Sequence, residues 1–333
     1  MRAYIIRRLL LMIPTLFLVT SIVFLLVRFI PGDVVDTMMA EMGAAGGGGL
    51  ESVDMTKEML KTKLGLDVPI HTQYARWLGI APTPEYGYSG LLQGSLGRSL
   101  WRDLPIWGEV LPKIPVSLEL GTLSIIIAIL IALPIGIYSA IRQDTIGDYS
   151  GRTVAILAIS LPGFWLATIV MVYPAIWWQW MPSIVYISIT EDLLGNLRQF
   201  ILPAFIMGMV SSGTKMRMTR TMMLEVLRQD YIRTAWSKGL TERTVIMRHA
   251  LKNALIPVVT IIGLQVPILI GGSVIMESIF NLPGIGRYML QAIQTRDYPV
   301  ISAINVILAS FVLIINLVVD LTYGWLDPRV QYR

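Results

Sequence analysis

Six long apolar stretches alternate with polar segments along the chain and predict six transmembrane helices. A helix needs about 20 mostly apolar residues to cross a hydrocarbon core of about 30 Å. The stretches of suitable length are residues 9–30, 117–141, 153–178, 200–216, 257–280 and 300–325. The fourth is the shortest, since its apolar part ends at Ser211, Ser212 and Gly213. The pattern predicts an all-α integral membrane protein.

The first apolar stretch has two interpretations, because Arg2, Arg7 and Arg8 precede it as they would in a signal peptide. A signal peptide has an apolar region of about 7–15 residues and a cleavage site of small residues. This run is longer, and it ends in Arg28 and Pro31-Gly32-Asp33. We therefore expect a retained first span.

Composition agrees with a membrane protein. The 333 residues are 54% hydrophobic and 15% charged, whereas soluble domains carry about 25% charged residues. The net charge of +5 is also typical of nucleic-acid binding. In a membrane protein, basic residues are retained on the cytoplasmic side, so we expect no nucleic-acid partner.

The loop charges predict one orientation. Residues 214–256 hold nine basic side chains and three acidic ones, whereas residues 31–116 hold seven basic and ten acidic ones. With the basic loops inside, both termini are expected to be cytoplasmic. We expect an N-terminal segment and first span (1–30), an external lobe (31–116), and a five-helix core (117–333) with a cytoplasmic coupling loop (214–256).

The predicted spans lack the chemistry of a self-powered transporter or an enzyme. Ion-coupled transporters bury ionisable groups in mid-membrane, but here Arg28, Glu119, Glu277 and Asp320 lie near span ends. The sequence has no Gly-x-x-x-x-Gly-Lys-Ser/Thr phosphate loop, no cysteine and only two histidines. We expect a non-enzymatic chain with no cofactor or metal, driven by energy from outside.

The predicted external lobe has several features of its own. Gly46–Gly49 form a glycine tract, and residues 55–64 have helical spacing. Six aromatic residues predict either a binding surface or an interfacial belt: Tyr74, Trp77, Tyr86, Tyr88, Trp101 and Trp107.

The basic loop contains a pattern beyond charge. From Glu225 the sequence predicts a short helix ended by Gly239, a residue suited to the left-handed position after a helix. Thr241 is then expected to cap a second helix that leads towards Pro257. The residues alone leave two interpretations open: a partner-docking helix, or a solvated basic loop that only sets orientation.

Motifs along nearly the whole chain resemble the dipeptide/oligopeptide (peptide/nickel) permease family of ABC importers. Arg233-Thr234-Ala235, Lys238-Gly239 and residues 249–257 resemble the loop with which such permeases meet their ATPases. Further matches are residues 7–9, 13–15, 29–33, 64–67, 94–99, 161–165, 277–286, 296–299 and 326–329.

The resemblance implies a type I ABC importer permease fold with six transmembrane helices and a large external lobe. It implies half of a translocation pathway for di- or oligopeptides, formed with a second homologous permease. Two ATPase subunits would bind ATP and Mg²⁺, and an external binding protein would deliver the substrate. Nickel chelates, glutathione, opines and oligosaccharides are alternative substrates, and a stand-alone secondary transporter or channel is an alternative of another class.

The resemblance also assigns an ATPase-coupling role to one set of residues: Tyr231, Arg233, Thr234, Ala235, Lys238, Gly239, Leu240, Arg243, His249 and Asn253. A cysteine at Ala235 is expected to crosslink to the ATPase groove. The family's loop glutamate is replaced by Arg233, and Gly239 lies farther from Pro257 than in the family pattern. Residues 41–52 and 79–91 look like additions to the external lobe. The basic side chains are expected to meet the ATPase or anionic lipid headgroups.

Overall fold

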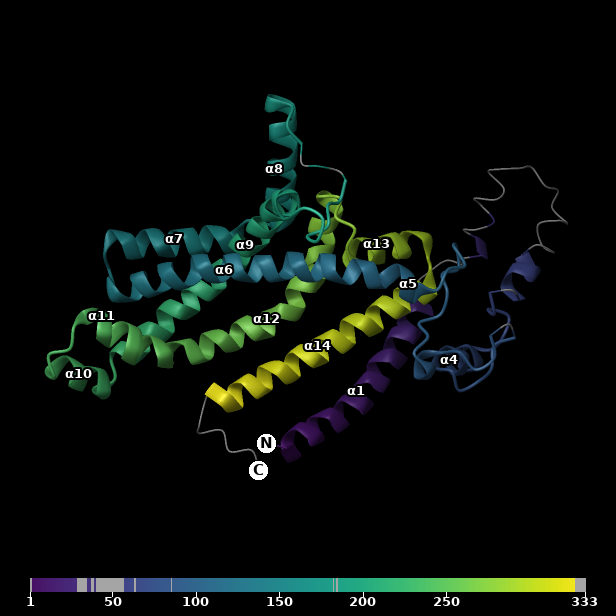
Figure 1. The fold of residues 1–333 in the computed structure, drawn as a ribbon, viewed down its shortest axis with the longest axis horizontal. Helices are drawn as coiled ribbons and strands as arrows, with labels where there is room; N and C mark the ends of the chain where they lie inside the picture. The colour runs from purple at the N-terminus through teal and green to yellow at the C-terminus, as the bar shows by residue number, and fades with distance from the viewer. Residues whose placement is uncertain are drawn as a thin grey trace. The chain divides into compact units, whose positions relative to one another are not determined.

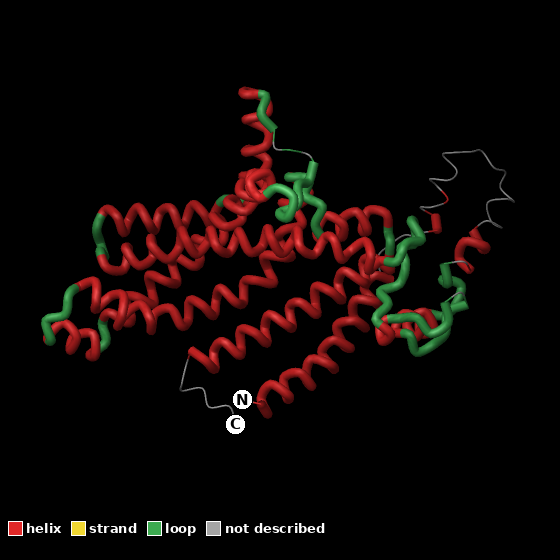
Figure 2. Tube along the Cα trace, viewed as in Figure 1, coloured by secondary structure: helices red, strands yellow, loops and turns green. Residues whose placement is uncertain are grey.

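The computed structural model describes residues 2–28, 35–36, 39, 57–62, 64–84, 86–181, 183 and 185–326. These residues form helices and connecting turns, and the described part of the chain contains no β-strand beyond two isolated bridges (Figure 2). The residues divide into two compact units. One comprises residues 116–286 and 312–333, and the other comprises residues 2–115 and 287–311.

Within the described residues, five helices are long and apolar enough to cross a membrane, and a bent pair raises the number of candidate spans to six. The five are α1 (Arg2–Arg28), α6 (Ile114–Ile141), α9 (Leu193–Leu227), α12 (Leu251–Ile279) and α14 (Tyr298–Leu326). Each overlaps a stretch predicted from the apolar pattern. The fourth stretch is the core of α9, which is 35 residues long.

The third predicted span is not one straight helix. It forms α7 (Ile146–Ser160) and α8 (Gly163–Trp178), which meet at 88° and are visibly bent apart in Figure 1. The break lies at Leu161 and Pro162. Proline disfavours helical backbone in the residue before it, and Leu161 has an extended conformation with φ −87° and ψ 122°.

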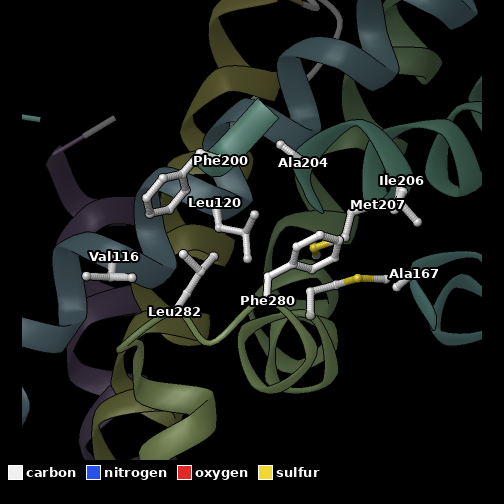
Figure 3. Packing of buried hydrophobic residues seen from close by; sticks show 10 residues of the cluster. Val116, Leu120, Ala167, Phe200, Ala204, Ile206, Met207, Phe280 and Leu282 are labelled. Atoms are coloured by element: carbon white, nitrogen blue, oxygen red, sulfur yellow. The ribbon is translucent and has the colours of Figure 1, made fainter. Parts of the chain in front are cut away.

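The core of the first unit lies among α6, α8, α9 and the end of α12. Leu120, Phe200 and Phe280 are almost completely buried, and their side chains gather with those of seven other residues (Figure 3). Close approaches hold α9 in place. A Cβ atom on Gly208 would lie 2.8 Å from the Ser124 carbonyl oxygen, and one on Gly213 would lie 2.6 Å from the Ala155 carbonyl oxygen.

A buried carboxylate fixes the C-terminal part of α12. Glu277, predicted near a span end, is fully buried and accepts hydrogen bonds from Ser117 Oγ at 2.6 Å and Ser273 Oγ at 2.8 Å. The Ser117 hydroxyl also accepts a hydrogen bond from the Ile285 amide at 2.9 Å. Glu277 thereby joins α6, α12 and the start of α13 (Ile285–Thr295).

The second unit contains α1, α4 (Ile70–Leu78), α5 (Ile106–Val110) and the segment between α13 and α14. Asp297 is buried and accepts hydrogen bonds from Ser99 Oγ at 2.5 Å and the Leu100 amide at 3.2 Å. The Trp101 indole donates to the Thr295 carbonyl at 2.8 Å. These contacts attach residues 99–101 to the turn before α14.

The aromatic residues of this unit divide into two groups. Tyr74 and Trp77 pack on Phe24 of α1, with ring centroids 5.1 and 5.6 Å from it. Tyr86, Tyr88 and Trp107 are exposed. Of the predicted helix at 55–64, residues 57–62 are helical, while the glycine tract and residues 41–52 lie outside the described residues. Residues 79–91 form turns around an isolated bridge between Thr83 and Gly87.

Candidate ATPase-docking site

The segment between α9 and α12, residues 228–250, is called the docking element below. It contains α10 (Asp230–Ser237) and α11 (Glu242–Thr244) and is seen at the left of Figure 1. The prediction that a short helix starts at Glu225 was wrong by five residues. Glu225 belongs to α9, whose apolar face extends to Leu227, and Gln229 is extended with ψ 148°. Asp230 follows in the first turn of α10, where a carboxylate stabilises the helix N-terminus.

One face of α10 is buried against the ends of three long helices. Ile232 and Ala235 are three residues apart and therefore lie on the same helix face. Both are buried, with 0% and 5% of their surface exposed. They pack with Ala140 of α6 and Met223 of α9, and with residues on the way into α12: Val245, Ile246, Ala250 and Ala254. Ala235 therefore fixes α10 to the core, and a cysteine there is not accessible for the expected crosslink.

Gly239 ends α10 as predicted. Its φ of +73° is in the left-handed region, and its amide donates to the Trp236 carbonyl at 2.9 Å. A side chain at this position would meet no atom within 4 Å, so backbone conformation rather than space favours glycine. Leu240 then turns inward and packs against the buried cluster.

The second half of the docking element, residues 241–250, is helical but irregular. Thr241 occupies the N-cap position of α11, but its hydroxyl bonds the Thr244 hydroxyl at 2.9 Å instead of a backbone amide. A π-helical turn follows at Val245–Ala250 and leads directly into α12. The expected second helix is therefore continuous with the fifth span. Its irregular turn brings both Val245 and Ile246 into the buried cluster.

A hydrogen bond connects α10 to the start of α12. Asn253, in the first turn of α12, donates its side-chain amide to the Tyr231 hydroxyl at 2.8 Å and to the His249 carbonyl at 3.4 Å. Tyr231 and Asn253 are both exposed, while His249 is half-buried. These three residues of the coupling set lie together.

The remaining predicted residues form the solvent face of the docking element. Arg233, Thr234, Lys238 and Arg243 are exposed. The Arg233 guanidinium lies 3.9 Å from the Asp230 carboxylate, with both side chains largely in solvent, so the pair contributes little stability. The face is basic and carries its charge on long side chains.

Two further residues of this face are absent from the predicted set. Trp236 and Met247 are 45% and 55% exposed. A partner bound to this face would cover both side chains. Trp236 is one residue past Ala235 and so points away from the buried face, which the sequence alone did not identify. The position of Met247 depends on the π-helical turn.

An open groove of about 510 Å³ lies beside the break between α9 and α10. Its lining is polar except for one leucine: Arg220, Thr221, Leu224, Glu225, Arg228 and Gln229. Arg220 also forms a bidentate ion pair with the buried Asp148 of α7, at 2.8 and 2.7 Å. Among the described residues, no three His, Asp or Glu side chains converge as metal ligands.

Comparison with known proteins places this geometry in a family. Residues 1–121 and 132–332 match the N-terminal and main models of the binding-protein-dependent transport system inner membrane component. The chain is 35% identical to the dipeptide transport system permease protein DppB of Escherichia coli over 356 residues. It is 37% identical to the di/tripeptide transport system permease protein DppB of Pseudomonas aeruginosa over 353 residues. Both chains are covered completely in each alignment.

Two more relatives agree with this placement. A putative peptide transport system permease protein of Brucella abortus is 38% identical over 332 residues, again with full coverage of both chains. A crystal structure of an amino acid ABC transporter with histidines shares the fold, with a TM-score of 0.50 and 14% identity. It covers 65% of this chain and 92% of that one. The chain is an inner-membrane, multi-span protein, and it belongs to the family of binding-protein-dependent transport system inner membrane components.

Proposed function

We propose that this chain is the non-catalytic permease subunit of an ATP-driven importer of di- and oligopeptides. It forms half of the translocation pathway, and a second homologous permease forms the other half. Two ATPase subunits bind ATP and Mg²⁺ on the cytoplasmic side, where both termini also lie. An external binding protein delivers the peptide. The peptide permeases among its full-length relatives support the substrate class.

The observation that carries the coupling role is the two-sided packing of α10. Ile232 and Ala235 are buried against α6, α9 and the entry to α12, while Trp236, Arg233 and Lys238 are exposed. A force applied to the exposed face is therefore transmitted to three long helices through close-packed side chains. The docking element fits an ATPase groove that accepts an aromatic residue among basic ones.

Adjacent positions on α10 offer a sharp test of docking. The native chain contains no cysteine, so Thr234→Cys and Ala235→Cys each introduce a single thiol. With cysteines placed in turn along the ATPase groove, Thr234→Cys should form a crosslink and the buried Ala235→Cys should not. Crosslinks at Ala235 alone, or at neither position in an active transporter, would contradict docking through this face.

Transport itself is tested in proteoliposomes that contain both permeases and both ATPases. Labelled dipeptide should enter only with ATP and binding protein, and collapse of ion gradients should leave uptake unchanged. Uptake by this chain alone, driven by an ion gradient, would instead support a stand-alone transporter. ATP-dependent uptake of a labelled nickel chelate, glutathione or oligosaccharide, with no uptake of dipeptide, would support one of the alternative substrates.

Orientation is tested with the same cysteine-free background. Thr234→Cys and Ser95→Cys lie on opposite sides of the membrane in the proposed topology. A membrane-impermeant thiol reagent applied to intact spheroplasts should label Ser95→Cys alone, and permeabilisation should expose Thr234→Cys.

A further inference from the structure

A buried lysine joins α9 to α12. Lys215 was grouped with the basic loop by sequence, yet it lies inside α9 with 1% of its surface exposed. Its ammonium group donates hydrogen bonds to the Ser211 hydroxyl, to the Ser211 carbonyl oxygen at 3.3 Å, and to the side-chain carbonyl of Gln265 on α12. Lys215, Ser211 and Gln265 are called the α9–α12 clamp below.

The clamp holds a positive charge with neutral acceptors only. In the part of the chain that the structure describes, the lysine ammonium contacts hydroxyl and carbonyl oxygens and no carboxylate. A buried charge costs several kcal/mol unless it is paired with an opposite charge. An apolar residue such as methionine would fill the same space without that cost. Fold stability alone therefore does not account for the lysine.

The other ties of α9 are of a different kind. Gly208 and Gly213 bring its backbone against α6 and α7 with no room for a side chain, and Arg220 forms its bidentate ion pair with Asp148 of α7. Close backbone packing of this kind resists small displacements. α9 also packs along α12, and the clamp adds to that packing a contact between two long side chains, which can separate by rotamer changes.

The clamp also lies at similar distances along α9 and α12, the two helices that the docking element connects. Lys215 is 12 residues before the end of α9 (227 − 215), and Gln265 is 14 residues after the start of α12 (265 − 251). At 1.5 Å per residue these are about 18 and 21 Å from the docking element. Any change in the angle between α9 and α12 at the docking element must therefore act on the clamp.

We propose that the α9–α12 clamp is a breakable contact that sets the resting arrangement of these two helices, and that ATPase closure must open it. Lys215 and Gln265 are thus positioning residues for coupling, and they touch neither ATP nor peptide. The proposal rests on the proposed function as an ATP-driven importer. According to this proposal, the strength of the contact between Lys215 and Gln265 determines how strictly ATP hydrolysis depends on the binding protein.

Two substitutions should change ATP hydrolysis in opposite directions. Lys215→Met removes the clamp at similar volume, so the reconstituted transporter should hydrolyse ATP about three- to tenfold faster without binding protein, the range expected for interhelical hydrogen bonds. Gln265→Glu places a carboxylate against the ammonium and strengthens the clamp, so hydrolysis and peptide uptake should both fall. Thr260→Val is the matched control on α12, because the Thr260 hydroxyl bonds only the Ile256 carbonyl of its own helix.

The opposite signs distinguish a clamp from a structural residue. A merely structural role predicts that hydrolysis follows thermal stability, so that it falls in Lys215→Met and does not fall in Gln265→Glu. Hydrolysis unchanged in both variants, or shifted in the same direction in both, would overturn the proposal. If the wild-type complex lacks ATPase activity stimulated by binding protein, the proposed function itself fails. A stimulated wild type with unresponsive variants refutes only the clamp.

Discussion

The Tyr231 hydroxyl accepts a 2.8 Å hydrogen bond from the Asn253 side-chain amide and so connects α10 to the first turn of α12. Tyr231→Phe removes this bond and leaves the ring in place. One such bond contributes about 0.5–1.5 kcal/mol, so we expect peptide uptake to fall about two- to twelvefold, with normal membrane insertion. Tyr173→Phe, on the exposed side of α8, is the control. Equal uptake by both variants would show that this bond does not contribute to coupling.

Gly239→Val should impair docking through backbone conformation. A β-branched residue is disfavoured at φ +73°, so we expect the end of α10 to shift, with a loss of ATPase binding and uptake. Gly239→Asn is the matched control, because asparagine tolerates the left-handed conformation and the site has room for a side chain. Co-purification of the ATPase measures docking directly. Full retention of ATPase by the valine variant would refute the assignment.

Arg220→Met should lower the thermal stability of the detergent-solubilised protein more than any exposed charge substitution. It leaves the buried Asp148 carboxylate with the Asp144 amide at 3.0 Å and the Arg152 side chain at 3.5 Å as partners. Breaking a buried pair costs about 3–5 kcal/mol. In the control Arg233→Met, an exposed pair is lost, with an expected cost of at most about 1 kcal/mol. The double variant Asp148→Leu/Arg220→Met should regain part of the loss, and no recovery would point to packing instead of charge.

The contribution of Asp297 to the free energy of unfolding should fall as the pH rises. Burial raises the pKa of the Asp297 carboxyl, even though Ser99 and Leu100 donate hydrogen bonds to it. The folded protein therefore binds this proton more tightly than the unfolded chain does. The stabilisation is complete below the ordinary aspartate pKa of about 3.9 and is lost as the pH rises through the raised value.

Thermal unfolding between about pH 4 and pH 7 measures this dependence. Asp297→Asn should reduce the slope of stability against pH. Ser99→Ala removes a donor to the carboxylate, raises the pKa further and should extend the slope to higher pH. A slope that is the same in all three proteins would rule out Asp297 as its source.

Much of the fold could be predicted from the apolar pattern, because a membrane span must satisfy its backbone internally and so forms a helix over a readable length. The bend between α7 and α8 was also encoded locally at Pro162, but an apolar count over residues 153–178 does not detect it. The length of α9 could not be predicted from apolarity. Its C-terminal half is polar in sequence, and helix packing brings Lys215 and Thr219 out of solvent.

In the docking element, backbone conformation could be predicted from residue type, but the burial of side chains could not. Gly239 has a conformation that favours glycine, so its role followed from residue type alone. The inward orientation of Ala235 depends on the ends of α6, α9 and α12, which lie far away in the sequence. The pairing of Tyr231 with Asn253 likewise depends on the π-helical turn between them, which residue spacing did not reveal.

The length of α9 has a mechanical consequence. Its 35 residues extend about 52 Å, whereas the hydrocarbon core is about 30 Å thick. The helix is therefore longer than the hydrocarbon core is thick, and its C-terminal end extends beyond the lipid headgroups. A partner that binds α10 can tilt α9 without touching the bilayer. A small tilt of α9 within the membrane then becomes a larger sideways displacement at the end where the partner binds.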